Sequence, residues 1–187
     1  MEYKLKRLKR ETVCRGSVLE FCKDTMELPD GAKADWDFVH HPTGGACIVP
    51  VLSDGRILLE KQFRPAIDRE TLELPAGARD SLGEDSMAAA ARELEEETGY
   101  RSKSIRPLIR LKTAVSWCDE FTDVYLAEEL EKLPERHLDQ AEEIGLVALP
   151  LEDLLSKIYS GELQDAKTVA GILAYACRKT QPFGQPR

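Results

Sequence analysis

The sequence has no apolar run that approaches the roughly 20 residues needed to cross a bilayer, so we expect no membrane span. Its opening residues lack the apolar stretch and small-residue cleavage site of a secretory signal. The five cysteines are odd in number and show no C-x-x-C spacing, which argues against a zinc cluster and a complete disulfide framework. The three histidines show no metal-ligand spacing either. We therefore predict a cytoplasmic protein with reduced thiols.

Positively charged residues are fewer than negatively charged ones. The sequence has 26 Lys and Arg against 34 Asp and Glu, for a formal net charge of −8. Such a surface disfavours nonspecific binding to a nucleic-acid backbone. A polyanionic small-molecule substrate would meet the same repulsion unless bound divalent cations removed it locally. The charge balance therefore favours metal dependence and argues against nucleic acid as a partner.

The length of 187 residues suits one domain that buries about 70% of its unfolded surface. We expect antiparallel strands over residues 1–42, a main domain over 43–179 and a frayed tail at 180–187. Extended patterns are expected at 17–26, 36–41, 46–52, 56–64, 71–74, 105–112 and 122–126. Helical patterns are expected at about 85–98, 150–159 and 165–177. Strands on both sides of one central helix, with two late helices, predict an α/β fold: a mixed sheet sandwiched by helices.

Glutamates crowd one short segment, Arg92-Glu-Leu-Glu-Glu-Glu-Thr-Gly-Tyr100. On a helix, Glu93, Glu96 and Glu97 project within about one quadrant, and Glu95 points about 100° or more away. Like charges at i,i+3 and i,i+4 repel, and Arg92 can relieve only part of that repulsion through Glu96. The segment is either a solvated acidic helix face or a carboxylate cluster for a hard cation such as Mg²⁺.

The order of residues decides between these interpretations. A glycine, Gly77, precedes Glu84, and seven residues separate Glu84 from the run Arg92 to Tyr100, a pattern that resembles the Nudix box of the Nudix hydrolases. The second half matches at every defined position. In the first half six residues separate Gly77 from Glu84, where the family has five. The extra residue falls in the loop before the helix, so the phase of the glutamate face is unchanged.

The resemblance implies a Nudix-type α/β/α sandwich, divalent-metal catalysis and a set of metal ligands. Mg²⁺ is the expected cofactor and Mn²⁺ is possible in the same role. The implied metal ligands are the Ala76 carbonyl and the carboxylates Glu93, Glu96 and Glu97. Arg92 is implied to orient a glutamate.

Residues ahead of the box narrow the resemblance to a subgroup. Gln62-Phe-Arg64 and Glu73-Leu-Pro-Ala-Gly77 look like the paired motifs of ADP-ribose pyrophosphatases. The resemblance implies that Arg64 contacts a diphosphate and that Glu73 belongs to the substrate site; a strand-end arginine reaching into water is the alternative for Arg64. Ser116-Trp-Cys stands where many relatives have Ser-Pro-Gly, which leaves the exact substrate open.

The subgroup places its catalytic base on a loop beyond the box and dimerises through its N-terminal sheet. Glu142 is the first candidate for the base, with Glu143 second and Glu120 as a rival. Trp36 is the candidate for stacking on a bound base across a homodimer, with a half-buried sheet tryptophan as the alternative. The leading prediction is hydrolysis of ADP-ribose or a related nucleoside diphosphate sugar. A dinucleoside polyphosphate, a dinucleotide coenzyme or an oxidised nucleotide is the alternative substrate, and a sensor that binds ADP-ribose without cleaving it is the alternative function.

Overall fold

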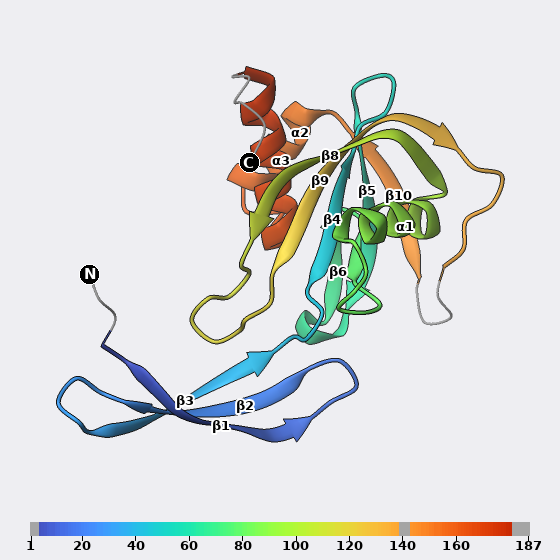
Figure 1. The fold of residues 1–187 in the computed structure, drawn as a ribbon. Helices are drawn as coiled ribbons and strands as arrows, with labels where there is room; N and C mark the ends of the chain where they lie inside the picture. Colours follow the sequence, from blue (N-terminus) through green and yellow to red (C-terminus); the bar gives the residue numbers. More distant parts are fainter. Residues whose placement is uncertain (1–3, 139–142, 181–187) are drawn as a thin grey trace. The chain divides into compact units, whose positions relative to one another are not determined.

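The computed structural model describes residues 4–138 and 143–180 (Figure 1). The chain divides into two compact units. One unit comprises the residues up to Gly44 together with Lys112–Phe121, and the other comprises Gly45–Leu111 and the residues from Thr122 onward.

The first unit is built on a three-stranded antiparallel sheet of order β1-β2-β3. Its strands are β1 (Lys6–Arg15), β2 (Glu20–Glu27) and β3 (Lys33–His40). The segment Lys112–Phe121 joins β3 through backbone bonds, since the Val39 amide donates to the Trp117 carbonyl at 2.7 Å. The Asp119 carboxylate accepts from the His41 amide at 2.9 Å and pairs with His40 Nδ1 at 2.7 Å. This segment therefore belongs to the N-terminal sheet although it is distant in sequence.

The described residues of the second unit form two sheets and three α-helices. The antiparallel sheet, of order β10-β5-β6, contains β5 (Ile57–Arg64), β6 (Arg69–Glu73) and β10 (Ile144–Leu149). The mixed sheet, of order β7-β4-β9-β8, contains β4 (Gly45–Pro50), β7 (Ala76–Ala78), β8 (Tyr100–Leu111) and β9 (Thr122–Lys132). Strands β4 and β9 are parallel and the other pairs are antiparallel. The helices are α1 (Ser86–Thr98), α2 (Leu151–Tyr159) and α3 (Ala166–Thr180).

Strand β4 is buried along its whole length because both faces of the mixed sheet are covered. One face, with Ala46 and Ile48, packs against Ala89, Ala90 and Leu94 of α1. The alternate residues of β4 face the core under α2 and α3. Gly171 of α3 lies so close to this face that an added Cβ would stand 2.8 Å from Leu74. The helices therefore sandwich the sheet (Figure 1).

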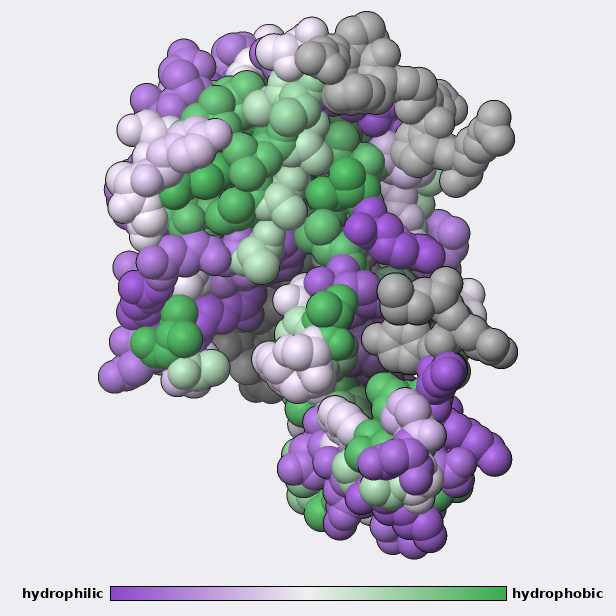
Figure 2. Space-filling model, turned by 90° about the vertical axis from the view of Figure 1, so that its left-hand side faces the viewer, coloured by the Kyte–Doolittle hydropathy of each residue, from purple (hydrophilic) through white to green (hydrophobic). Residues whose placement is uncertain are grey.

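The side of the second unit that carries α2 and α3 shows a continuous apolar surface bordered by hydrophilic side chains (Figure 2). Helix α3 has few exposed positions, and Val169 and Ala174 are among its apolar residues that pack partly against the core. No helix among residues 4–138 and 143–180 is long and apolar enough to cross a membrane.

The expected α/β sandwich is confirmed, and so are all three expected helices. Helix α1 ends where predicted, because Gly99 adopts the left-handed conformation with φ 70° that closes a helix. Strand β10 was not predicted, because its sequence, Ile-Gly-Leu-Val-Ala-Leu, does not alternate between apolar and polar residues. Strand β8 begins at Tyr100 rather than near Ile105, because its polar first residues lie at the edge of the sheet. The expected tail lies outside the described residues except for Thr180.

Candidate active site

Helix α1 begins at a side-chain cap, and its first turn is bonded to a neighbouring strand. The Asp85 carboxylate accepts from the amides of Met87 and Ala88 at 3.0 and 3.1 Å, which satisfies two of the free amides at the helix start. In the first turn Ser86 Oγ donates to Asp123 at 2.8 Å and lies 2.6 Å from the Tyr125 hydroxyl. The helix start is therefore attached to β9.

Asp123 is held in turn from β8. Arg110 Nη2 donates to its carboxylate at 2.8 Å, and the carboxylate is only 10% exposed. Burial alone would raise the pKa of Asp123, but the bonds from Arg110 and Ser86 and the positive charge of Arg110 keep that pKa below its ordinary value. The clamp formed by Ser86, Asp123, Tyr125 and Arg110 thus carries an ionised carboxylate.

Two box glutamates turn inward from α1. Glu93 and Glu97 are 8% and 4% exposed. The Ala76 amide donates to Glu97 Oε2 at 3.0 Å. A Cβ on Gly77 would lie 2.0 Å from Glu93 Oε1, so the carboxylate can keep this position only beside a glycine. The helix therefore places two carboxylates beside residues 76 and 77, at the start of β7.

Arg92 pairs with three carboxylates of the box. Its Nη1 donates to Glu93 at 2.8 Å and to Glu96 at 3.0 Å, and its Nε donates to Glu84 at 3.4 Å. Burial alone would lower the pKa of Arg92, but the surrounding carboxylates raise it above its ordinary value. Arg92 is therefore a permanent cation among three box glutamates.

The extra residue ahead of the helix is accommodated in a turn. The Glu84 amide donates to the Ser81 carbonyl at 3.2 Å, and the Glu84 carboxylate accepts from the Asp80 amide at 2.6 Å. Glu84 therefore still reaches Arg92. Glu95 faces elsewhere, since Arg101 Nε donates to it at 2.7 Å.

The donor chemistry of the box fits a hard divalent cation, because the buried groups beside Ala76 and Gly77 are carboxylates. Across the described parts of the chain, no three carboxylate, imidazole or thiol side chains already form a metal cage. Arg92 engages Glu93 and Glu96, and the Ala76 amide engages Glu97. Ion binding would thus require these carboxylates to exchange partners.

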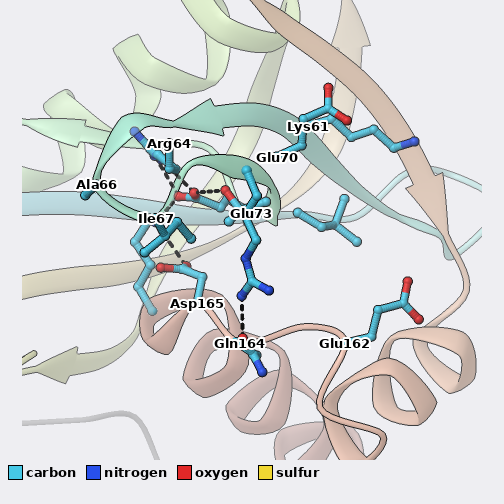
Figure 3. Close-up of a pocket in the computed structure, with 13 residues that line it drawn as sticks. Lys61, Arg64, Ala66, Ile67, Glu70, Glu73, Glu162, Gln164 and Asp165 are labelled. Atoms are coloured by element: carbon cyan, nitrogen blue, oxygen red, sulfur yellow. Dashed lines mark hydrogen bonds and ion pairs between the residues drawn. The ribbon is translucent and has the colours of Figure 1, made fainter.

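A second charged cluster lies beside the box, at the strand that leads into it (Figure 3). Arg64 forms a bidentate pair with Glu73, with Nε at 2.7 Å and Nη2 at 2.6 Å. Lys167 of α3 and the Thr71 hydroxyl also donate to Glu73. The Glu73 side chain is only 4% exposed. Its carboxylate therefore contacts other side chains and hardly contacts solvent.

Burial opposes ionisation of Glu73, but Arg64, Lys167 and Thr71 outweigh it and lower its pKa to about 2. Burial likewise opposes the charge on Lys167, and Asp165 and Glu73 together raise its pKa. Asp165 also accepts from Lys167 Nζ at 3.0 Å. Glu73, Lys167 and Arg64 are consequently ionised near neutral pH.

Sequence reasoning singled out Arg64 and Glu73 but missed the groups of α3 that hold them. Thr168 Oγ1 accepts from the Leu74 amide at 2.8 Å, 94 positions away. Asp165 accepts from the Thr168 amide at 3.0 Å, in the manner of a helix cap. An aspartate three residues before a threonine at a helix start was the available signal, but it indicates a cap and not a partner.

The remaining predicted residues are Glu142, Glu143, Glu120 and Trp36. Glu142 lies outside the described residues, and Glu143 is exposed. Glu120 belongs to the first unit, where it accepts from the Thr113 hydroxyl at 2.7 Å. Trp36, on β3 of the same unit, is 42% exposed.

The pocket in Figure 3 lies between the β5–β6 hairpin and the turn from α2 to α3, and its volume is about 840 Å³. Arg64, Glu73 and Lys167 form part of its wall. Pockets that bind small molecules usually fall between 300 and 1,000 Å³, so its size suits a nucleotide-like ligand.

Comparison with known proteins identifies the fold and the family. A solved structure described as the crystal structure of an ADP compounds hydrolase superposes with a TM-score of 0.84, covers 96% of each chain and is 23% identical, which supports the fold. An ADP-ribose pyrophosphatase of Bacillus subtilis is 38% identical over 89% of this chain and 90% of its own length. A methanol dehydrogenase activator of Bacillus methanolicus is 33% identical over the same shares. The NUDIX domain model matches residues 41–171, and the chain belongs to the NUDIX domain family.

Proposed function

We propose that this protein is a Mg²⁺-dependent pyrophosphohydrolase that splits ADP-ribose, or a related nucleoside diphosphate sugar, into a nucleoside monophosphate and a sugar phosphate. The observation that carries the proposal is the close approach of buried Glu93 and Glu97 to Ala76 and Gly77, immediately after the strand that ends at Glu73. The name of the Bacillus subtilis relative supports ADP-ribose as the substrate.

Nudix hydrolases use a divalent metal ion, and here Ala76, Glu93, Glu96 and Glu97 would hold it. We propose Mg²⁺, with Mn²⁺ as a substitute, because both accept several oxygen ligands. When bound, such an ion neutralises diphosphate oxygens and lowers the pKa of a bound water.

Arg92 would keep Glu93 and Glu96 on one side of the helix, through the bonds of 2.8 and 3.0 Å described above. Arg64 would contact the diphosphate. Its pair with Glu73 uses Nε and Nη2, so the hydrogens on Nη1 are not committed to that pair. Glu73 would then serve the substrate through Arg64, by orienting the guanidinium.

A glutamate beyond the box would remove the proton from the attacking water. We propose Glu142 for this role, then Glu143, with Glu120 as the rival. A carboxylate can act as this base once the loop that carries it places an oxygen within hydrogen-bond reach of the water.

We also propose a cytoplasmic homodimer in which Trp36 stacks on the base of the bound nucleotide. The exposed apolar side chains of the first unit support a protein partner for this sheet: Leu8, Val13, Val18, Phe21 and Trp36 are each at least 39% exposed. Light scattering on a sizing column should give twice the monomer mass of 21.0 kDa. A monomer at all concentrations would reject the dimer.

The test of the reaction is direct. Purified protein with Mg²⁺ and ADP-ribose should release AMP and ribose 5-phosphate. Lack of turnover across a panel of nucleoside diphosphate sugars, dinucleotide coenzymes, dinucleoside polyphosphates and oxidised nucleotides would reject the proposal. Mg²⁺-dependent binding of ADP-ribose without turnover would favour the sensor.

Glu97→Gln should remove most of the activity, because the amide offers a metal ion no negative charge. Glu95→Gln is the matched control on the same helix, since its side chain pairs with Arg101 instead. Circular dichroism should show both variants folded. Full activity in Glu97→Gln would contradict the metal assignment.

A further inference from the structure

The pocket of Figure 3 extends beyond the arginine assigned to the diphosphate. Strands β5 and β6 are joined by a short 3₁₀ turn, Pro65–Ile67, and by Asp68, whose φ of 51° places it in the left-handed region. This tight connection sets Arg64 and Arg69 directly opposite each other in the ladder. Residues opposite each other in an antiparallel pair point to the same face, and both line the pocket.

The two guanidinium groups differ in how their charge is compensated. Arg64 is paired with Glu73, which is also shared with Lys167. Arg69, by contrast, forms no ion pair with a carboxylate within the described residues and donates only to the side-chain oxygen of Gln164. Arg69 therefore keeps a positive charge that a ligand can neutralise.

The acidic groups of the wall do not cancel this charge. Glu73 and Asp165 are bound to Lys167, as described above. Glu162 pairs with Lys157 at 2.5 Å. Glu70 and Lys61 both line the pocket, and their opposite charges offset each other.

The rest of the wall suits a sugar ring. Ile67 and Leu72 supply apolar surface, and Ile67 is 51% exposed. The Gln164 amide supplies both a donor and an acceptor for hydroxyl groups. A phosphate on Arg69 with a ribose between these groups satisfies the charge, the hydrogen bonds and the apolar contact together.

We propose that this pocket binds a ribose 5-phosphate unit and that Arg69 is a direct contact of its phosphate. The proposal rests on the proposed function, because ADP-ribose carries two such units and Arg64 links the pocket to the box. Both the adenosine half and the terminal sugar half contain a ribose 5-phosphate unit. AMP serves as the probe for the first half and ribose 5-phosphate as the probe for the second.

Steady-state kinetics with ADP-ribose give the first test. Arg69→Gln removes the charge and keeps a polar side chain, so KM should rise about tenfold, the loss expected for one charge-assisted contact, while kcat stays within about twofold. Arg69→Lys keeps the charge but loses the forked guanidinium, so its KM should lie between those of wild type and Arg69→Gln. Arg56→Gln is the control, since exposed Arg56 lies on the β4–β5 turn and pairs with Asp54. An unchanged KM in folded Arg69→Gln would overturn the proposal.

Binding without metal separates this site from the reaction. Calorimetry in EDTA should show that wild-type protein binds AMP or ribose 5-phosphate, and the tighter of the two identifies the half that occupies the pocket. Arg69→Gln should weaken that binding at least fivefold, and Arg56→Gln should not. If inorganic phosphate binds as tightly as AMP and ribose 5-phosphate do, the ribose assignment is refuted. Arg69-dependent binding in a protein that hydrolyses nothing would support the pocket while rejecting the proposed function.

Discussion

Glu73→Gln tests the charged cluster next to the box because it removes one charge and little volume. The Glu73 pKa of about 2, against an ordinary value of 4.5, means that the folded state favours the ionised form. At 1.36 kcal/mol per unit, this difference corresponds to about 3 kcal/mol of stability at pH 7. Arg64 and the largely buried Lys167 would also lose their shared partner. We therefore expect the variant to unfold more easily by about 3 kcal/mol.

The pH dependence has a definite sign. Because the folded pKa is depressed, the contribution of Glu73 is complete well above pH 4.5 and is lost as the pH falls toward 2. Urea unfolding of wild type and Glu73→Gln should therefore differ by about 3 kcal/mol at pH 7 and by about 1.5 kcal/mol at pH 3.

Glu162→Gln is the matched control in the same pocket. Its side chain is 64% exposed and pairs with Lys157, so its effect should stay below about 1 kcal/mol. A difference between wild type and Glu73→Gln that is equal at both pH values would refute the reasoning, because the carboxylate charge would then not be the source of the stability.

Two further changes test the attachment of the box helix. Gly77→Ala places a Cβ 2.0 Å from Glu93 Oε1, so we expect most Mg²⁺-dependent turnover to be lost, and a Mg²⁺ titration of kcat that matches wild type would contradict the assignment. Tyr125→Phe removes the hydroxyl that lies 2.6 Å from Ser86 Oγ and should cost about 1 kcal/mol in urea unfolding. Tyr175→Phe, another buried tyrosine, has no hydroxyl bond among the described side chains and should cost less; equal losses in the two variants would argue against the clamp.

The local features of the box could be predicted from the sequence because they depend on neighbours along the chain. The spacing of Glu93, Glu96 and Glu97 places them on one side of any helix, and Gly99 ends that helix wherever it lies. The separation of Glu95 from this group follows from the same geometry. The extended segments β4 and β5 and the turn between them were readable for the same reason, since strand composition and turn residues are local signals.

The partners of these side chains could not be predicted in the same way. Glu73 and Lys167 are 94 positions apart. Their pairing depends on how α3 packs against the strand end at Leu74, whose amide donates to Thr168 of that helix. The role of Asp123 depends on the register between β8 and β9, which sets Arg110 opposite it. Neither position carries a local pattern that distinguishes it from an ordinary surface charge.

The sequence by itself determined the family resemblance, the helix that carries the glutamates and the side of that helix they occupy, because these follow from short-range periodicity. Only the tertiary structure decided that Glu84, in the loop before the helix, also reaches Arg92, and that Arg69 faces a pocket without a carboxylate partner among the described residues. The physical reason is that charge compensation depends on distances between separate elements, which the packing of the sheets and helices sets.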